Sequence, residues 1–179
     1  MRVEVPNRAR DIGEAVSGMS TIMKPLLRLC DAVALIALAV LFGVVAANVL
    51  GRALFDATGQ SLNLMIPGAI ELSRYALMVL VFASLPRAAE AGMVRVDLLI
   101  DRLPPLLSRF LDSLWGLAIA AFGGATGWLL IEDALLQARR GDATQDLEMP
   151  LWLLTGFAGL ASLALAQTGL WLAFRPGRQ

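Results

Sequence analysis

The chain alternates between long apolar stretches and short polar segments over most of its length. Three of the apolar stretches, residues 32–50, 114–131 and 151–174, contain no charged residue. At about 1.5 Å per residue, helices of these lengths cover roughly 27–36 Å, and the hydrocarbon core of a bilayer is about 30 Å thick. The pattern therefore predicts three membrane-spanning helices.

A less uniform apolar stretch lies between the first two of these. Residues 75–86 are apolar but too short to cross a membrane alone. An extension back to residue 70 gives enough length and brings in Glu71 and Arg74, which share a helix face and can pair. A span that starts near Pro67 or Gly68 is predicted here. The four expected spans cover about residues 30–51, 69–87, 112–132 and 150–174.

The segments outside the spans have different characters. Residues 1–28 are polar and lack the apolar core of a signal peptide, so we expect an N-terminal tail, a membrane domain over 29–174 and a short tail at 175–179. Between spans two and three, a helical apolar stripe predicts an amphipathic interfacial helix that breaks near Pro104 and Pro105. Such a helix either clamps the spans or a partner at the membrane surface or only connects two spans. The stripe consists of Val96, Leu99, Ile100, Leu103, Leu107 and Phe110.

Composition and charge place the chain among membrane proteins. Hydrophobic residues make up 58% and charged residues 17%, whereas soluble domains are about half apolar and about a quarter charged. With four apolar spans, this predicts an all-α integral membrane fold. The net charge of zero gives no support for nucleic-acid binding. Of the 15 Lys and Arg residues, eleven lie in the two tails and the second loop, so both termini are predicted to be cytoplasmic.

The chemistry available to the chain is narrow. It has no histidine and one cysteine, which excludes histidine-dependent catalysis, histidine-ligated metals and an intrachain disulfide. No carboxylate lies near the middle of a predicted span, where a proton-coupled carrier usually needs one. We expect no catalytic residue, substrate-binding residue, metal site or cofactor. The third loop is expected to be acidic and solvated, with Glu132, Asp133, Asp142, Asp146 and Glu148.

Two residue types within the spans have structural interpretations. Gly123, Gly124 and Gly127 of the third span are small enough to allow close helix packing. The four tryptophans lie near span ends, where indole rings commonly anchor a helix at the membrane interface. They are Trp115, Trp128, Trp152 and Trp171.

Five short motifs occur in order around the four spans. Together they resemble the small permease component, or Q-type subunit, of the tripartite ATP-independent periplasmic (TRAP) transporters. The resemblance covers about residues 28–174. The motifs are NVLGRALF at 48–55, ELSRY at 71–75, FASLPR at 82–87, VRVDLLIDRLP at 94–104 and LEMPLW at 147–152.

The resemblance implies a non-enzymatic subunit of the bacterial inner membrane. Such a subunit scaffolds a large multi-span permease subunit, which uses an ion gradient to take up an organic acid delivered by a periplasmic binding protein. Membrane lipid is the other expected contact. A self-sufficient small oligomeric transporter and an integral membrane enzyme are the alternatives. The motif positions expected to be structural or to face the partner are Asn48, Arg52, Glu71, Arg74, Tyr75, Arg87, Asp97, Asp101, Arg102, Pro150 and Trp152.

Overall fold

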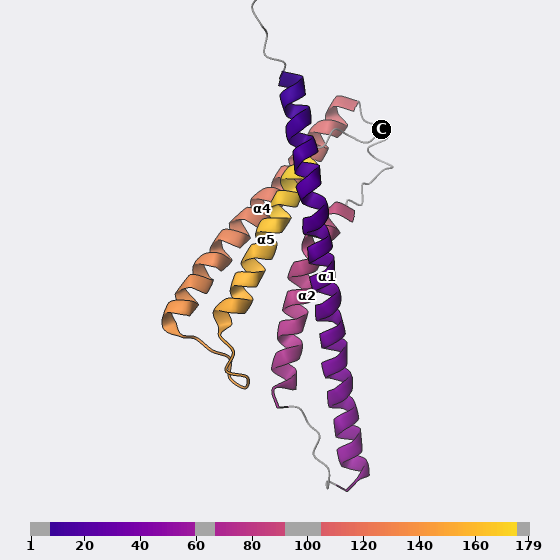
Figure 1. Ribbon diagram of the computed structural model, residues 1–179, viewed down its shortest axis with the longest axis vertical. Helices are drawn as coiled ribbons and strands as arrows, with labels where there is room; N and C mark the ends of the chain where they lie inside the picture. The colour runs from indigo at the N-terminus through magenta and orange to yellow at the C-terminus, as the bar shows by residue number, and fades with distance from the viewer. Residues whose placement is uncertain (1–7, 60–66, 92–104, 175–179) are drawn as a thin grey trace, which may run out of the picture.

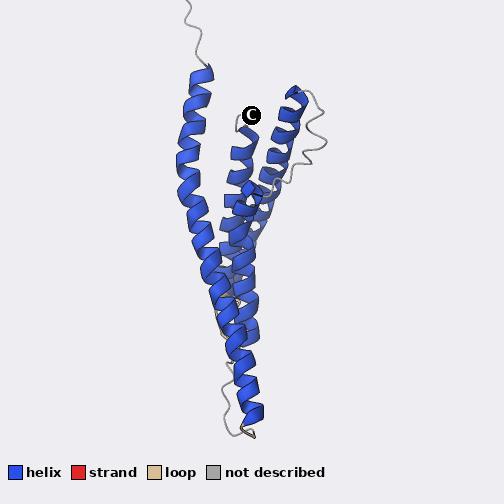
Figure 2. Cartoon of the chain, turned by 90° about the vertical axis from the view of Figure 1, so that its right-hand side faces the viewer, coloured by secondary structure: helices blue, strands red, loops and turns tan. Residues whose placement is uncertain are grey.

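A computed structural model describes residues 8–59, 67–91 and 105–174 of the chain. Over these ranges the fold is all-α, with helices α1 (Arg8–Ala57), α2 (Ala69–Ala91), α4 (Pro105–Arg140) and α5 (Leu151–Phe174). Each helix contains a stretch long and apolar enough to cross a membrane. The predicted fold class, a four-span α-helical membrane protein, is confirmed (Figures 1 and 2).

The helices form two antiparallel hairpins. Helix α1 packs along α2, and α4 packs along α5, while α2 also packs against α5. We call the end where α1 leads to α2 and α4 leads to α5 the loop end, and the opposite end, where α1 begins and α5 finishes, the terminal end (Figure 1). Helix α5 lies between α4 and the first hairpin, and it is the most buried of the four spans.

Small residues allow α4 and α5 to approach closely. A Cβ atom added at Gly123 would lie 2.7 Å from the backbone nitrogen of Ala166. One added at Gly127 would lie 2.8 Å from the Leu163 side chain, whereas one added at Gly124 would meet nothing closer than 4.0 Å. Close packing was therefore predicted correctly for Gly123 and Gly127, and Gly124 does not take part in it. The side chains of Thr155 and Gln137 add a 2.9 Å hydrogen bond between the two helices.

At the terminal end, α1 is joined to α5 by a small core. Met23 and Leu27 of α1 pack with Trp171 of α5, and the three side chains are 1%, 4% and 7% exposed. The Thr168 hydroxyl, which donates to the Ala164 carbonyl of its own helix at 2.9 Å, also lies 3.7 Å from the Met23 sulfur. Trp171 is thus a core residue, and the prediction that it anchors the helix at the membrane interface is wrong.

The helix limits refine the predicted segments. Helix α1 begins at Arg8, so it continues from the predicted tail into the first span without interruption. Helix α4 continues to Arg140, which places Glu132 and Asp133 in its last turns and leaves only residues 141–150 for the third loop. Pro105 is the first residue of α4, as the predicted break required. The amphipathic segment before it lies outside the described residues.

Candidate functional site

The loop between α4 and α5 is a compact turn rather than an open connection. Gly141 leaves α4 with a φ of 70°, a left-handed conformation that glycine adopts easily. Ala143 and Pro150 then form an isolated antiparallel bridge. Between them, the Thr144 amide donates to the Met149 carbonyl at 2.9 Å, and the Met149 amide donates to the Thr144 hydroxyl at 2.9 Å. This pairing directs the amides at the tip of the loop towards α2.

The carboxylate of Glu71, in the first turn of α2, accepts these amides. The Gln145 amide donates to Oε1 at 3.2 Å, and the amides of Asp146 and Leu147 donate to Oε2 at 3.0 Å each. The Tyr75 hydroxyl, one helical turn further along α2, donates to Oε1 at 3.0 Å. Hydrogen bonds to an ionised acceptor are stronger than those between neutral groups. Glu71 therefore joins two segments that are about 75 residues apart in sequence.

The prediction that Glu71 pairs with Arg74 is wrong. Both carboxylate oxygens of Glu71 are engaged by Tyr75 and the loop amides, and the Arg74 side chain is exposed. The physical reason is that backbone amides from another part of the chain compete for the carboxylate. The sequence placed Glu71 and Arg74 on one helix face but contained no signal that the α4–α5 loop would lie beside them.

Near the terminal end, Arg87 of α2 forms an ion pair with α1. Its guanidinium lies 3.1 Å from the Asp31 carboxylate and 2.8 Å from that of Glu90. The Arg87 side chain is half exposed, so the pair lies at the surface of the bundle. Asp31 was not among the predicted site residues, because its position at the start of an apolar span resembles an ordinary helix end.

The other predicted positions are not gathered around one centre. Asn48 and Arg52 lie near the loop end of α1, where Figure 1 shows the helix continuing past the start of α2. Pro150 precedes α5, and Trp152 in its first turn is 42% exposed. The structure brings together Glu71 and Tyr75 with the loop before Pro150. Three predicted positions, Asp97, Asp101 and Arg102, lie outside the described residues.

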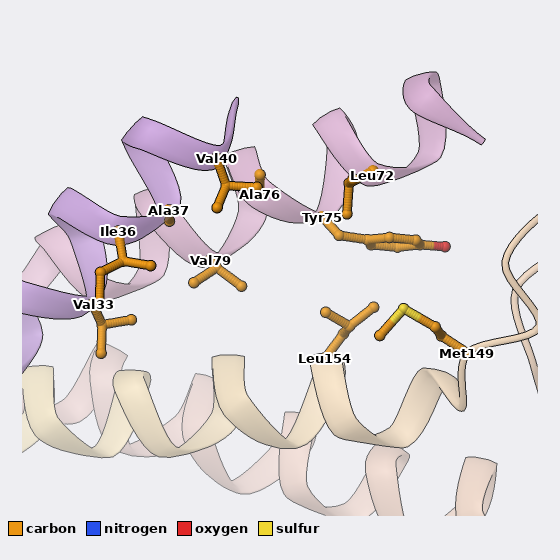
Figure 3. Close-up of a pocket in the computed structure, with 10 residues that line it drawn as sticks. All are labelled: Val33, Ile36, Ala37, Val40, Leu72, Tyr75, Ala76, Val79, Met149 and Leu154. Atoms are coloured by element: carbon orange, nitrogen blue, oxygen red, sulfur yellow. The ribbon is translucent and has the colours of Figure 1, made fainter. Parts of the chain in front are cut away.

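An apolar groove separates the two hairpins in the middle of the bundle. It has a volume of about 320 Å³ and is lined by α1, α2, α5 and the end of the α4–α5 loop. Tyr75 lies close to Met149 and Leu154 at one side of this groove, and Val33 lies towards its other end (Figure 3). Apart from the Tyr75 hydroxyl, the side chains that line it are hydrocarbon or thioether, so the groove has no groups to recognise a charged solute.

The described part of the chain holds no arrangement suited to metal binding. Within residues 8–59, 67–91 and 105–174, no three His, Cys, Asp or Glu side chains are grouped so that they could hold an ion. The buried polar side chains described there belong to threonine and serine, and Thr155, Ser162 and Thr168 each donate to an acceptor in the chain.

Residues 41–174 match the family model of the tripartite ATP-independent periplasmic transporters, DctQ component. The chain belongs to this family. The matched region of the DctQ component includes α2, α4, α5 and about the last third of α1, and with them Glu71, the α4–α5 loop and Trp171. It begins after Met23, Leu27 and Asp31. No curated protein and no solved structure shows significant similarity to the chain.

Proposed function

We propose that this DctQ component is a scaffold for a large permease subunit of the same transporter. In this proposal the large subunit binds the substrate, an organic acid carried in by a periplasmic binding protein, and couples its movement to an ion gradient. Membership of the DctQ family carries the proposal, since a tripartite transporter contains further subunits. The protein described here would supply apolar helix surface and position rather than transport chemistry.

The buried polar groups of the bundle support this division of labour. Transporter sites commonly use polar or ionisable groups near the middle of the membrane. Among the described side chains, the buried polar ones are hydroxyls, of which Ser162 and Thr168 donate to carbonyls of their own helix. The Glu71 carboxylate is at the loop end and is engaged by loop amides. Within the described residues, these polar groups are bound to partners in the chain itself and form no polar centre for an acid substrate.

The outward surface of the bundle also supports a scaffold. Very little of the most apolar part of α1 is buried within the chain, whereas half of the corresponding part of α5 is buried. Large side chains such as Phe42 on α1 and Phe122 on α4 are 75% and 66% exposed. In a membrane, such surfaces are covered by lipid or by another helix. The chain therefore offers two long helix faces on which a multi-span partner and lipid can pack.

The decisive experiment is co-purification of the tagged chain with the proteins encoded beside its gene. We expect a multi-span permease to elute with it in a fixed ratio from mild detergent. Transport by the pair in proteoliposomes should require the permease, the binding protein and an ion gradient. The chain eluting alone, in a form that transports by itself, would contradict the scaffold and support the small oligomeric transporter.

We further propose that the protein lies in the bacterial inner membrane with both termini cytoplasmic and the α4–α5 loop periplasmic. Eleven of the 15 basic residues lie in the two tails and the second loop of the sequence, and basic residues favour the cytoplasmic side of spans. Single cysteines at Gln145 and at Ala91, each in a Cys30→Ser chain, test this orientation. An impermeant thiol reagent should label Gln145→Cys in intact spheroplasts and Ala91→Cys only after lysis. The reverse pattern would show the opposite orientation.

A further inference from the structure

The two hairpins are joined differently at their two ends. At the terminal end, Met23 and Leu27 pack with Trp171 in a closed apolar core. At the loop end, Glu71 of α2 accepts hydrogen bonds from the α4–α5 loop, and between the two joints lies the apolar groove. We propose that the Glu71 carboxylate is a latch: it holds the α4–α5 hairpin to α2 at the loop end, and its loss lets the hairpins separate there while the terminal end stays packed.

The chemistry of the latch depends on the negative charge and on both oxygens. Three consecutive amides point at one carboxylate, with two of them on Oε2 and one on Oε1 beside the Tyr75 hydroxyl. A glutamine side chain of the same length has one acceptor oxygen and an amide NH2 group that donates. Its oxygen could accept from only part of the loop, and its NH2 group would face the remaining N–H or O–H donors. The loop therefore needs the carboxylate itself, and charge-neutral replacement should weaken the joint.

The conformation of the loop shows what the latch restrains. Glu148, next to the bound amides, has a φ of 50°, which is uncommon for a residue with a side chain. Gly68, before α2, also has a positive φ of 71°, and a Cβ added there would lie 3.0 Å from Leu147. The loop thus lies directly against the start of α2, with an uncommon backbone conformation beside the amides that bind Glu71. Loss of the Glu71 carboxylate removes the hydrogen bonds that join this part of the loop to α2.

The latch also reaches into the groove. Tyr75, whose hydroxyl is bound to Glu71, lies close to Met149 at one side of the groove (Figure 3). Met149 is the residue whose backbone pairs with Thr144 to shape the loop. Figure 1 shows α5 and α2 leaning apart towards the loop end, with the α4–α5 loop reaching back to α2. One carboxylate thus fixes the loop, the tyrosine ring and the width of the groove together.

Distance measurements on the purified subunit test the latch independently of any partner. Spin labels at Leu54 and Leu135 report on the loop end, and labels at Leu29 and Leu114 report on the terminal end; all four side chains are exposed. In a Cys30→Ser chain, Glu71→Ala should shift the loop-end distances to longer values and broaden them, with the terminal-end distances unchanged. Arg74→Gln is the matched control, because it removes a charge from the same turn without touching the loop.

Hydrogen exchange gives a second measurement, made on the more conservative variant Glu71→Gln. The amides of Gln145, Asp146 and Leu147 should exchange about tenfold faster or more in Glu71→Gln, since charge-assisted hydrogen bonds protect them. Tyr75→Phe keeps the carboxylate and should change their exchange much less. Unchanged loop-end distances in Glu71→Ala, or an equal change in Arg74→Gln, would overturn the latch. Because no partner is present, either result leaves the scaffold proposal standing.

Discussion

Replacing Gly169 by alanine should loosen the α4–α5 hairpin and lower the thermal stability of the purified subunit. The added Cβ would lie 2.5 Å from the backbone nitrogen of Ala120 and 2.8 Å from the carbonyl oxygen of Gly116. Backbone atoms cannot rotate aside as a flexible side chain can, so the helices would have to move apart. Overpacking of this kind typically costs about 1–3 kcal/mol. For a chain of this size, each kcal/mol corresponds to roughly 2–4 °C in Tm.

Alanine substitutions elsewhere provide the matched controls. Gly124 lies on α4, and a Cβ there would meet only the Ala166 Cβ at 4.0 Å, an ordinary contact. A Cβ added at Gly43 of α1 would meet no atom of another helix within 4 Å. Within a helix, glycine is about 1 kcal/mol less favourable than alanine. Gly124→Ala and Gly43→Ala should therefore leave Tm unchanged or raise it, whereas Gly169→Ala lowers it. Equal changes in Tm for Gly169→Ala and Gly124→Ala would contradict the close packing of α5 on α4 at Gly169.

The same glycines show how far the sequence predicts the fold. Uncharged runs of 18 or more residues identify spans because hydrocarbon excludes unpaired backbone and charge. Glycines within such a run indicate close packing, as found at Gly123 and Gly127. Which glycines face the partner helix depends on the rotation of α4, which the spacing alone does not determine. The sequence therefore supplied the helices and the candidate interface but not the distinction between Gly123 and its neighbour Gly124.

The candidate site was predicted only in part, for a similar reason. Glu71 and Tyr75 were identified from a motif at the start of a span, and the structure joins them by a hydrogen bond. In the α4–α5 loop, Glu71 is bound by backbone N–H groups, which every residue except proline has and which leave no mark in the sequence. The position of the α4–α5 loop follows from the packing of α5 on α2, a long-range contact. Asp31 was missed because its partner, Arg87, is brought close only by the packing of α2 on α1.

Trp171→Ala should have the other large effect, because this tryptophan joins α5 to α1. Its side chain is 7% exposed and packs against Met23 and Leu27. In soluble proteins, removal of a buried tryptophan side chain costs about 3–5 kcal/mol. Part of that cost comes from transfer of apolar surface to water, and this part is smaller where lipid tails surround the helices. The loss of packing remains, so we expect a loss of about 2–3 kcal/mol, measured as a lower Tm in detergent.

Trp128→Ala is the matched control, since it makes the same chemical change on a surface where the indole is 72% exposed. Substitutions away from packed features usually change stability by less than about 0.5 kcal/mol. Trp171→Phe retains an aromatic ring in the core, so its Tm should lie between those of Trp171→Ala and Trp128→Ala. The two tryptophans cannot be told apart by hydropathy, as both lie near the ends of apolar stretches. Equal loss of Tm in Trp171→Ala and Trp128→Ala would mean that α1 is held by α2 alone, and that the core at the terminal end contributes little.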